Sequence, residues 1–213
     1  MTVQAPMPPG RLGGMACCVD FHFDFSSPYG FIAAMKIDEV AKAACRRLTW
    51  RPFLLGAVYK RFGQSPLEHP LKRRYVLEVD VPRVGRRDGL DIKVPMGFPQ
   101  HSLPAARLFY WIASQAPDKA PEFAKAAYRR YWLDGCSTAD PQTAVEVAAG
   151  LGFDRQKVEA GMQESSVKLK LTLENEQAIA KGVFGSPFIF VDGEPFWGSD
   201  RLDHVAERLA AKD

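Results

Sequence analysis

Hydrophobic and polar residues alternate strictly along the segment V-D-F-H-F-D-F, residues 19–25. A period of two predicts a β-strand, because successive side chains of a strand point to opposite faces. Asp20, His22 and Asp24 fall on the polar side of this strand. We expect His22 to have a structural role there.

Apolar residues recur every three or four positions after Pro28, which predicts a helix that runs to about Cys45. Ser27 precedes the proline, and this order is typical of a helix start, with serine as the cap and proline at the first helical position. The apolar stretch 48–55, which ends at Gly56, predicts a second strand.

Residues from about 66 to 181 have helical spacing interrupted by loop-like segments. Asp140-Pro141 is a helix start signal, a capping residue followed by proline. The helix candidates in this part of the chain are residues 67–84, 102–115, 119–133, 141–150, 154–162 and 165–181.

Strand patterns return near the C-terminal end. The apolar run 188–191 is followed by Asp192-Gly193, which suits a two-residue hairpin turn, and by a returning strand over 194–197. Ser199 and Asp200 both suit the cap of a final helix. The apolar face of that helix is Leu202, Val205 and Leu209.

The element order is therefore β-α-β, a helical block, and β-β-α. It predicts an α/β protein whose two ends form one small mixed sheet. We divide the chain into a flexible leader (1–17), a sheet domain (18–62 and 182–213) and an all-helical domain (63–181) inserted between the two halves. The leader is rich in proline and glycine and has no apolar core of the kind that secretory signals carry.

The composition is that of a globular chain, since 46% of the 213 residues are hydrophobic and 25% are charged. It excludes disorder over most of the chain. The net charge of +3 is small, and basic blocks such as 72–74 and 86–87 are interspersed with acids, so we expect solvated faces and no nucleic-acid partner. No apolar run reaches the ~18 residues of a membrane span, so we expect no membrane partner.

The four cysteines are Cys17, Cys18, Cys45 and Cys136. They form no C-x-x-C pair and no spacing typical of a zinc site. We therefore predict free thiols, no bound metal and a reducing cytoplasmic location. Without paired cysteines, a disulfide oxidoreductase is disfavoured.

Three segments resemble one known family. They are F-D-F-S-S-P-Y-G (23–30), G-V-F-G-S-P-F (182–188) and F-W-G-S-D-R-L (196–202). In this order they resemble the 2-hydroxychromene-2-carboxylate isomerase and kappa-class glutathione transferase family of the thioredoxin superfamily, over roughly residues 18–212. The resemblance implies a thioredoxin-like β-α-β…β-β-α domain with an inserted helical domain. Ser27-Pro28-Tyr29-Gly30 stands where the superfamily has its redox motif C-P-x-C.

Ser27 is the candidate catalytic residue. The start of a helix has unpaired N–H groups and a partial positive charge, which suit an anion such as the glutathione thiolate. Ser27 would donate its hydroxyl to that sulfur without reacting itself. The alternative is that Ser27 only caps the helix.

The resemblance also implies residues that bind reduced glutathione. Ser186 and Pro187 would hold the cysteinyl part, with a cis peptide bond between them, although a strand-start proline is the alternative. The γ-glutamyl end would lie at Trp197, Gly198, Ser199 and Asp200, where the alternative is a helix cap with Trp197 in the core.

The other wall of the site is less well defined by the sequence. Gln64 lies where the family often has asparagine and is one methylene longer. Lys72 matches a basic position for the glycyl carboxylate, or else lies on a solvated helix face. The candidate residues for the second substrate are Tyr29, Tyr59, Lys60, Gln100 and His101.

The resemblance implies a glutathione-dependent isomerase that acts on a small aromatic substrate as a homodimer. Its reaction would be reversible thiolate addition to an enone, bond rotation and elimination. A kappa-like glutathione transferase is the alternative enzyme. A non-catalytic thioredoxin-fold binding module is a further alternative, since it too would lack both cysteines.

Overall fold

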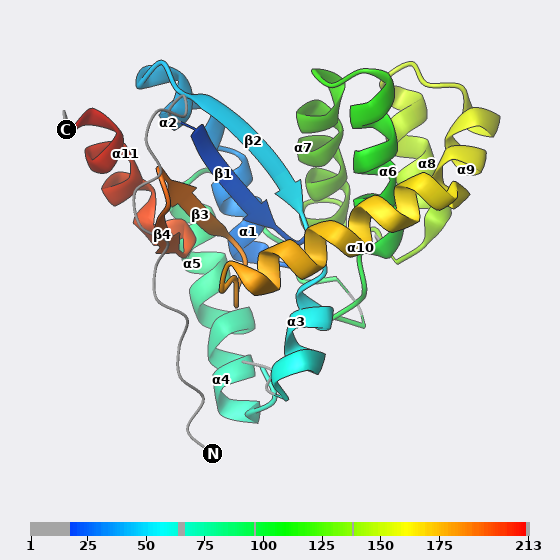
Figure 1. Cartoon of the computed structure of the whole chain (residues 1–213). Coiled ribbons are helices and arrows are strands. Elements are labelled where there is room, and N and C mark those ends of the chain that lie inside the picture. The colour runs from blue at the N-terminus through cyan, green and yellow to red at the C-terminus, as the bar shows by residue number, and fades with distance from the viewer. Residues whose placement is uncertain (1–17, 64–66, 96, 138, 212–213) are drawn as a thin grey trace.

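The ends of the chain form one four-stranded sheet in this computed structural model (Figure 1). The structure describes residues 18–63, 67–95, 97–137 and 139–211. The expected leader, Gln64 and the last two residues lie outside the described residues.

The strands are β1 (Cys18–Phe23), β2 (Arg47–Pro52), β3 (Phe188–Val191) and β4 (Glu194–Trp197), in the order β2-β1-β3-β4. β1 is parallel to β2 and antiparallel to β3, which is antiparallel to β4. The predicted mixed sheet and α/β class are thus confirmed. Asp192 and Gly193 both have positive φ, as the predicted β3–β4 turn requires.

Helices make up most of the rest of the described chain, and those of the middle part match their predicted segments closely. They are α1 (Pro28–Ala34), α2 (Ile37–Ala43), α3 (Leu55–Phe62), α4 (Pro70–Arg74), the π-helix η1 (Tyr75–Asp80), α5 (Val81–Arg87), α6 (Leu103–Gln115), α7 (Lys119–Trp132), α8 (Pro141–Gly150), α9 (Arg155–Gln163), α10 (Ser165–Ala180), the 3₁₀ turn η2 (Ser199–Arg201) and α11 (Leu202–Ala210). No helix among the described residues is long and apolar enough to cross a membrane.

The prediction of one helix up to about Cys45 was wrong. The chain forms α1 and α2 with a break at Met35 and Lys36, where the Lys36 N–H bonds to the Ala33 carbonyl in a tighter turn. Buried residues keep a spacing of three and four across the break, because Ala34, Ile37 and Ala41 all face the interior. Spacing alone therefore did not reveal it.

The extent of the second strand was also wrong. β2 ends at Pro52, and α3 begins at Leu55 within the predicted strand. The N–H groups that open α3 are satisfied from distant parts of the chain, Leu54 by the side chain of Asn175 at 2.8 Å and Leu55 by that of Asp24 at 2.6 Å. A search for a local capping residue could not detect this helix start.

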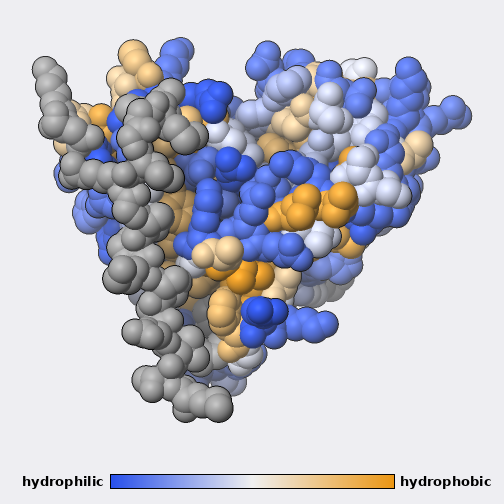
Figure 2. All heavy atoms as spheres, in the orientation of Figure 1, coloured by the Kyte–Doolittle hydropathy of each residue, from blue (hydrophilic) through white to orange (hydrophobic). Residues whose placement is uncertain are grey.

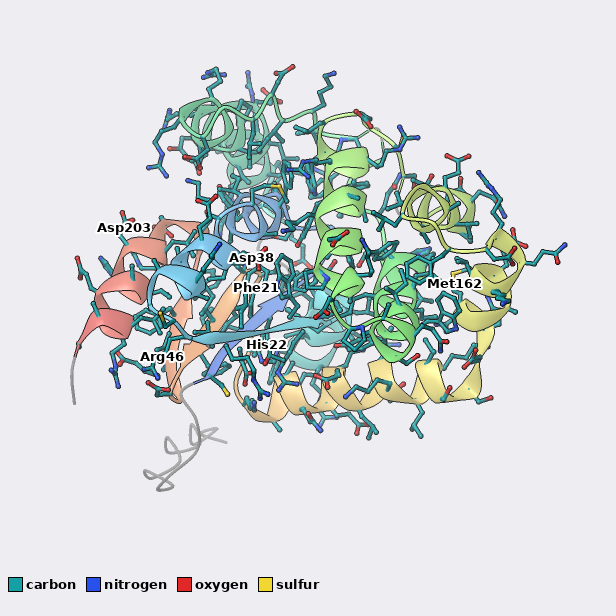
Figure 3. The ribbon with its side chains drawn as sticks, turned by 90° about the horizontal axis from the view of Figure 1, so that it is seen from above. Phe21, His22, Asp38, Arg46, Met162 and Asp203 are labelled. Atoms are coloured by element: carbon teal, nitrogen blue, oxygen red, sulfur yellow. The ribbon has the colours of Figure 1, made fainter. Side chains whose placement is uncertain are left out.

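Helices cover both faces of the sheet. Phe21 and the other large side chains of its face pack with α1, α2 and α11, whereas α3 and α10 pack on the face that holds Phe53 and Phe188 (Figures 1 and 3).

Helices α6 to α9 lie beyond the edge strand β2. The division into two domains stays a prediction. In Figure 2 hydrophobic atoms gather over α10, whose Leu169 and Leu173 are exposed.

His22 shows that the polar side of β1 is an interior surface. It is 1% exposed and lies edge-on to Phe53 and Phe190. Burial lowers the pKa of His22 to about 4, and the nearby cations Lys181 and Arg51 act in the same direction. A neutral imidazole is therefore part of the folded state at neutral pH.

We expect His22 to make the protein less stable in mild acid. The unfolded chain takes up a proton near pH 6.5 and the folded chain only near pH 4, so stability is retained above pH 6.5 and falls as the pH drops between these values. At pH 5 the loss from this residue is about 2 kcal/mol, since each pKa unit corresponds to ~1.4 kcal/mol. Urea unfolding at pH 7 and pH 5 measures it.

His22→Leu should reduce that pH-dependent loss. His204→Leu, which replaces an exposed histidine of α11, is the control and should retain it. An equal loss in the wild type and His22→Leu would contradict the assignment.

Candidate functional site

Ser27 links the start of α1 to the segment that precedes β3. It is 6% exposed, and its Oγ accepts a hydrogen bond from the Gly30 N–H at 3.0 Å. The same hydroxyl donates to the carbonyl oxygen of Ser186 at 2.7 Å. Ser27 therefore caps α1 as predicted and also joins two of the three quoted motifs.

Ser186 continues this link towards the third motif. The Ser186–Pro187 peptide bond is cis, as the family resemblance implied. The Ser186 side chain is buried and accepts from the N–H of Asp24 at 2.9 Å, while the Pro187 carbonyl accepts from the N–H of Gly198 at 3.2 Å. The three motifs thus converge on one place.

The third motif does not form the helix cap that we considered as an alternative. Trp197 is 55% exposed and packs against Phe184, with ring centroids 4.8 Å apart, so it is not a core residue. Ser199 is buried in η2 and Asp200 is exposed beside Arg201. Within the described chain, neither η2 nor α11 has a side-chain cap.

Asp24 is a buried acid that the sequence did not lead us to include in the site. Asp24 lies three residues before Ser27 in the chain and is 3% exposed. Oδ1 accepts from the Ser26 N–H at 2.8 Å and the Ser102 hydroxyl at 2.6 Å, and Oδ2 accepts from the Leu55 N–H. The available signal was its position inside the first motif.

Tyr128 of α7 is a second residue that the sequence did not indicate. Its buried hydroxyl donates to the Asp24 carbonyl at 2.8 Å. Burial, and then the charge of Asp24, raise the pKa of Tyr128 well above its usual value. A Cβ added at Gly30 would lie 2.6 Å from this hydroxyl and 2.8 Å from Ser186 Oγ. Tyr128 therefore occupies space that a side chain at position 30 would need.

Two of the predicted second-substrate residues lie in the surroundings of this site. The half-buried Tyr29 donates its hydroxyl to Asp80 of η1 at 2.5 Å. Burial comes first and Asp80 second in raising the pKa of Tyr29, and the charge of Asp200 adds to them. Burial and the charge of Asp24 likewise raise the pKa of the half-buried Tyr59. Both tyrosines thus remain protonated phenols at neutral pH.

The structure does not gather every predicted residue so closely. Lys60 on α3 and Lys72 on α4 are exposed. Gln100 is half-buried and accepts a hydrogen bond from the Ser137 hydroxyl, while His101 is exposed. Gln64 lies outside the described residues.

Two open cavities lie elsewhere on the molecule. One of about 550 Å³ is lined by residues of α7, α8 and α9, including Arg129 and Arg155. Another of about 350 Å³ lies beside Tyr110 and Lys170. Neither is lined by a predicted site residue, so we base the site on the hydrogen bonds among the three motifs.

Comparisons with known proteins identify the family of this chain. Residues 18–210 match the DSBA-like thioredoxin domain, and the chain belongs to that family. It is 28% identical over 198 residues to a 2-hydroxychromene-2-carboxylate isomerase of Sphingobium xenophagum, covering 92% of this chain and 99% of the relative. It is 26% identical to glutathione S-transferase kappa 1 of Caenorhabditis elegans, covering 90% of each chain.

A solved structure of a 2-hydroxychromene-2-carboxylate isomerase superposes with a TM-score of 0.81 at 25% identity. The superposition covers 90% of this chain and 94% of that one. The resemblance inferred from the three motifs is thus confirmed.

We expect Gly30→Ala to destabilise the fold, because the new methyl group would collide with the hydroxyls of Tyr128 and Ser186. Forced packing of this kind costs about 1–3 kcal/mol, measured as the free energy of unfolding in urea. Gly56→Ala, at a helical glycine with open space around it, is the control and should stabilise by roughly 0.5–1 kcal/mol.

Tyr128→Phe combined with Gly30→Ala tests the cause. Tyr128→Phe should cost less in the Gly30→Ala background than alone, since it removes the oxygen with which the new methyl group would collide. Strictly additive costs would show that Tyr128 does not restrict position 30.

Proposed function

We propose that the chain is a glutathione-dependent isomerase of the 2-hydroxychromene-2-carboxylate isomerase type, with a small aromatic second substrate. The observation that carries the proposal is the 2.7 Å hydrogen bond from Ser27 Oγ to the Ser186 carbonyl, where the three motifs meet. The names of the relatives support the substrate class. A homodimer and a cytoplasmic location stay predictions.

Reduced glutathione would lie across the junction of the three motifs. The main chain of Ser186 would pair with the cysteinyl unit next to Pro187. The exposed carboxylate of Asp200 would pair with the γ-glutamyl ammonium, which is a charge-assisted contact. The full set of proposed glutathione contacts is Ser27, Gln64, Lys72, Ser186, Pro187, Trp197, Gly198, Ser199 and Asp200.

The Ser27 hydroxyl has one proton and two possible acceptors. In the structure it donates to the Ser186 carbonyl. When an N–H of bound glutathione donates to the Ser186 carbonyl in its place, the Ser27 hydroxyl would turn towards the glutathione sulfur and donate to it. The exchange leaves each buried polar group with a partner, which is the usual condition in folded proteins.

Bound glutathione would supply a thiolate for reversible addition to an enone form of the substrate, which would make the former double bond a single bond that can rotate, and elimination would return the free thiol. Ser27 would stabilise the charged sulfur through its hydrogen bond and lower the thiol pKa. Tyr29, Tyr59, Lys60, Gln100 and His101 are proposed to orient the second substrate. Orienting two reactants accounts for a large part of such a rate increase.

A kappa-like glutathione transferase is the second candidate, because the relative from Caenorhabditis elegans matches over most of both chains. The two activities share the proposed glutathione site and differ in the product. A transferase leaves the second substrate attached to sulfur, whereas an isomerase returns free thiol. Mass spectrometry of glutathione after turnover distinguishes them.

Calorimetric titration near pH 7 should show one reduced glutathione bound per chain, with weaker binding of S-methylglutathione. Asp200→Ala should weaken binding about 10-fold, because it removes a charge-assisted contact at an exposed position. Asp203→Ala, at another exposed acid three residues on in α11 (Figure 3), is the matched control and should bind as the wild type does. No heat and no thermal shift at millimolar glutathione would contradict the proposal.

Ser27→Ala should lower turnover much more than it weakens glutathione binding, and it should shift the onset of activity to higher pH. The lost hydrogen bond disfavours the thiolate, and each unit of raised thiol pKa corresponds to ~1.4 kcal/mol. Ultraviolet absorbance of the bound thiolate measures this pKa directly. Ser26→Ala is the control, since Ser26 contacts Asp24 through its main-chain N–H. An unchanged thiol pKa and pH profile in Ser27→Ala would leave Ser27 as a helix cap only.

A further inference from the structure

The carboxylate of Asp24 joins segments that belong to different parts of the proposed site. It is buried, and all three of its described partners are hydrogen-bond donors. A carboxylate accepts at both oxygens, so donors from several segments can converge on one such group. The segments that meet here are the β1–α1 turn, the start of α3 and the start of α6.

The glutathione side of the site is tied to Asp24 mainly through its main chain. The Asp24 carbonyl accepts from the Ser27 N–H at 2.9 Å, and the Asp24 N–H donates to Ser186 Oγ at 2.9 Å. The Ser26 N–H adds a bond to Oδ1. Main-chain bonds survive a side-chain substitution, so this half of the site depends little on the carboxylate.

The second-substrate side is tied to Asp24 through its carboxylate. Oδ2 holds the Leu55 N–H at the start of α3, the helix that carries Tyr59 and Lys60. Oδ1 holds the hydroxyl of Ser102, which directly follows His101. The start of α3 and the segment before α6 are therefore both held by the Asp24 carboxylate.

Ser102 is the more informative of the two partners. It occupies the cap position of α6, yet its side chain makes no capping bond and donates to Asp24 at 2.6 Å instead. It is 1% exposed. A serine at this position ordinarily accepts from its own helix. Here the hydroxyl is used to join α6 to the β1–α1 turn.

We propose that Asp24 is a positioning residue that holds the second-substrate residues of α3 and of the segment before α6 in register with Ser27, and that Ser102 is its partner. The inference rests on the proposed function. A misplacement of about 1 Å between reactants costs on the order of 100-fold in rate, so such a link would act on turnover of the second substrate.

Ser102→Ala and Asp24→Asn test the proposal in the full chain. The probes are reduced glutathione for binding, and 2-hydroxychromene-2-carboxylate and 1-chloro-2,4-dinitrobenzene for turnover. We expect kcat/KM for the second substrate to fall about 10-fold or more in each variant, while the glutathione Kd stays within about 3-fold. Asp20→Asn is the matched control, because it removes a carboxylate four residues earlier, in β1, where Asp20 forms an ion pair with Arg51. Its kcat/KM should equal that of the wild type.

The double variant gives a readout that a merely structural role would not move. Because Asp24 and Ser102 act through one bond, Ser102→Ala should cost less in the Asp24→Asn background than alone. Ser102→Ala in the Asp20→Asn background should have its full effect. If Asp24→Asn does not fold, two measurements decide the question. They are the effect of Ser102→Ala alone and its effect in the Asp20→Asn background.

Each outcome is decisive. A folded Ser102→Ala with the kcat/KM of the wild type overturns the inference and leaves the proposed function intact. A parallel loss of glutathione binding also overturns it, because Asp24 would then serve the other half of the site. A wild type that gives no glutathione heat, or turns over neither electrophile, overturns the proposed function and this inference with it.

Discussion

A buried carboxylate obliges its surroundings to provide donors, and in this protein Asp24 imposes that condition on the fold. Removing a charge from water costs several kcal/mol unless hydrogen bonds compensate for it. The partners come from the adjoining turn, from Leu55 31 residues later and from Ser102 78 residues later. The β1–α1 turn, the start of α3 and the residue that precedes α6 each contribute one of these donors, so the three segments meet at Asp24.

Much of the fold was predictable from local patterns. Alternation identified β1, and the Asp140-Pro141 start and the Asp192-Gly193 turn were correct because each signal involves only neighbouring residues. The start of α3 was missed for the opposite reason. Its N–H groups bond to Asp24 and to Asn175, which is 121 residues away from its partner Leu54. Only tertiary structure brings such partners together.

The candidate site follows the same division. The three motifs were visible in the sequence, and the bond from Ser27 to Ser186 joins two of them over 159 residues. Tyr128 gave no signal, since a tyrosine on an amphipathic helix is indistinguishable from any other core aromatic until the helix is packed. The role of Trp197 was also unresolved, because exposure depends on what the rest of the chain leaves uncovered.

The tyrosine hydroxyl beside Gly30 limits which side chains this position can hold. A superfamily member with the motif C-P-x-C has a cysteine side chain at the fourth position. In this chain the fourth position is Gly30, and the Tyr128 hydroxyl occupies the space that a side chain there would need. Cysteines at 27 and 30 alone would therefore not suffice for dithiol chemistry, because the Tyr128 side chain of α7 would have to move away from position 30 first. Paired cysteines at positions 27 and 30 would therefore require changes in two separate helices, α1 and α7.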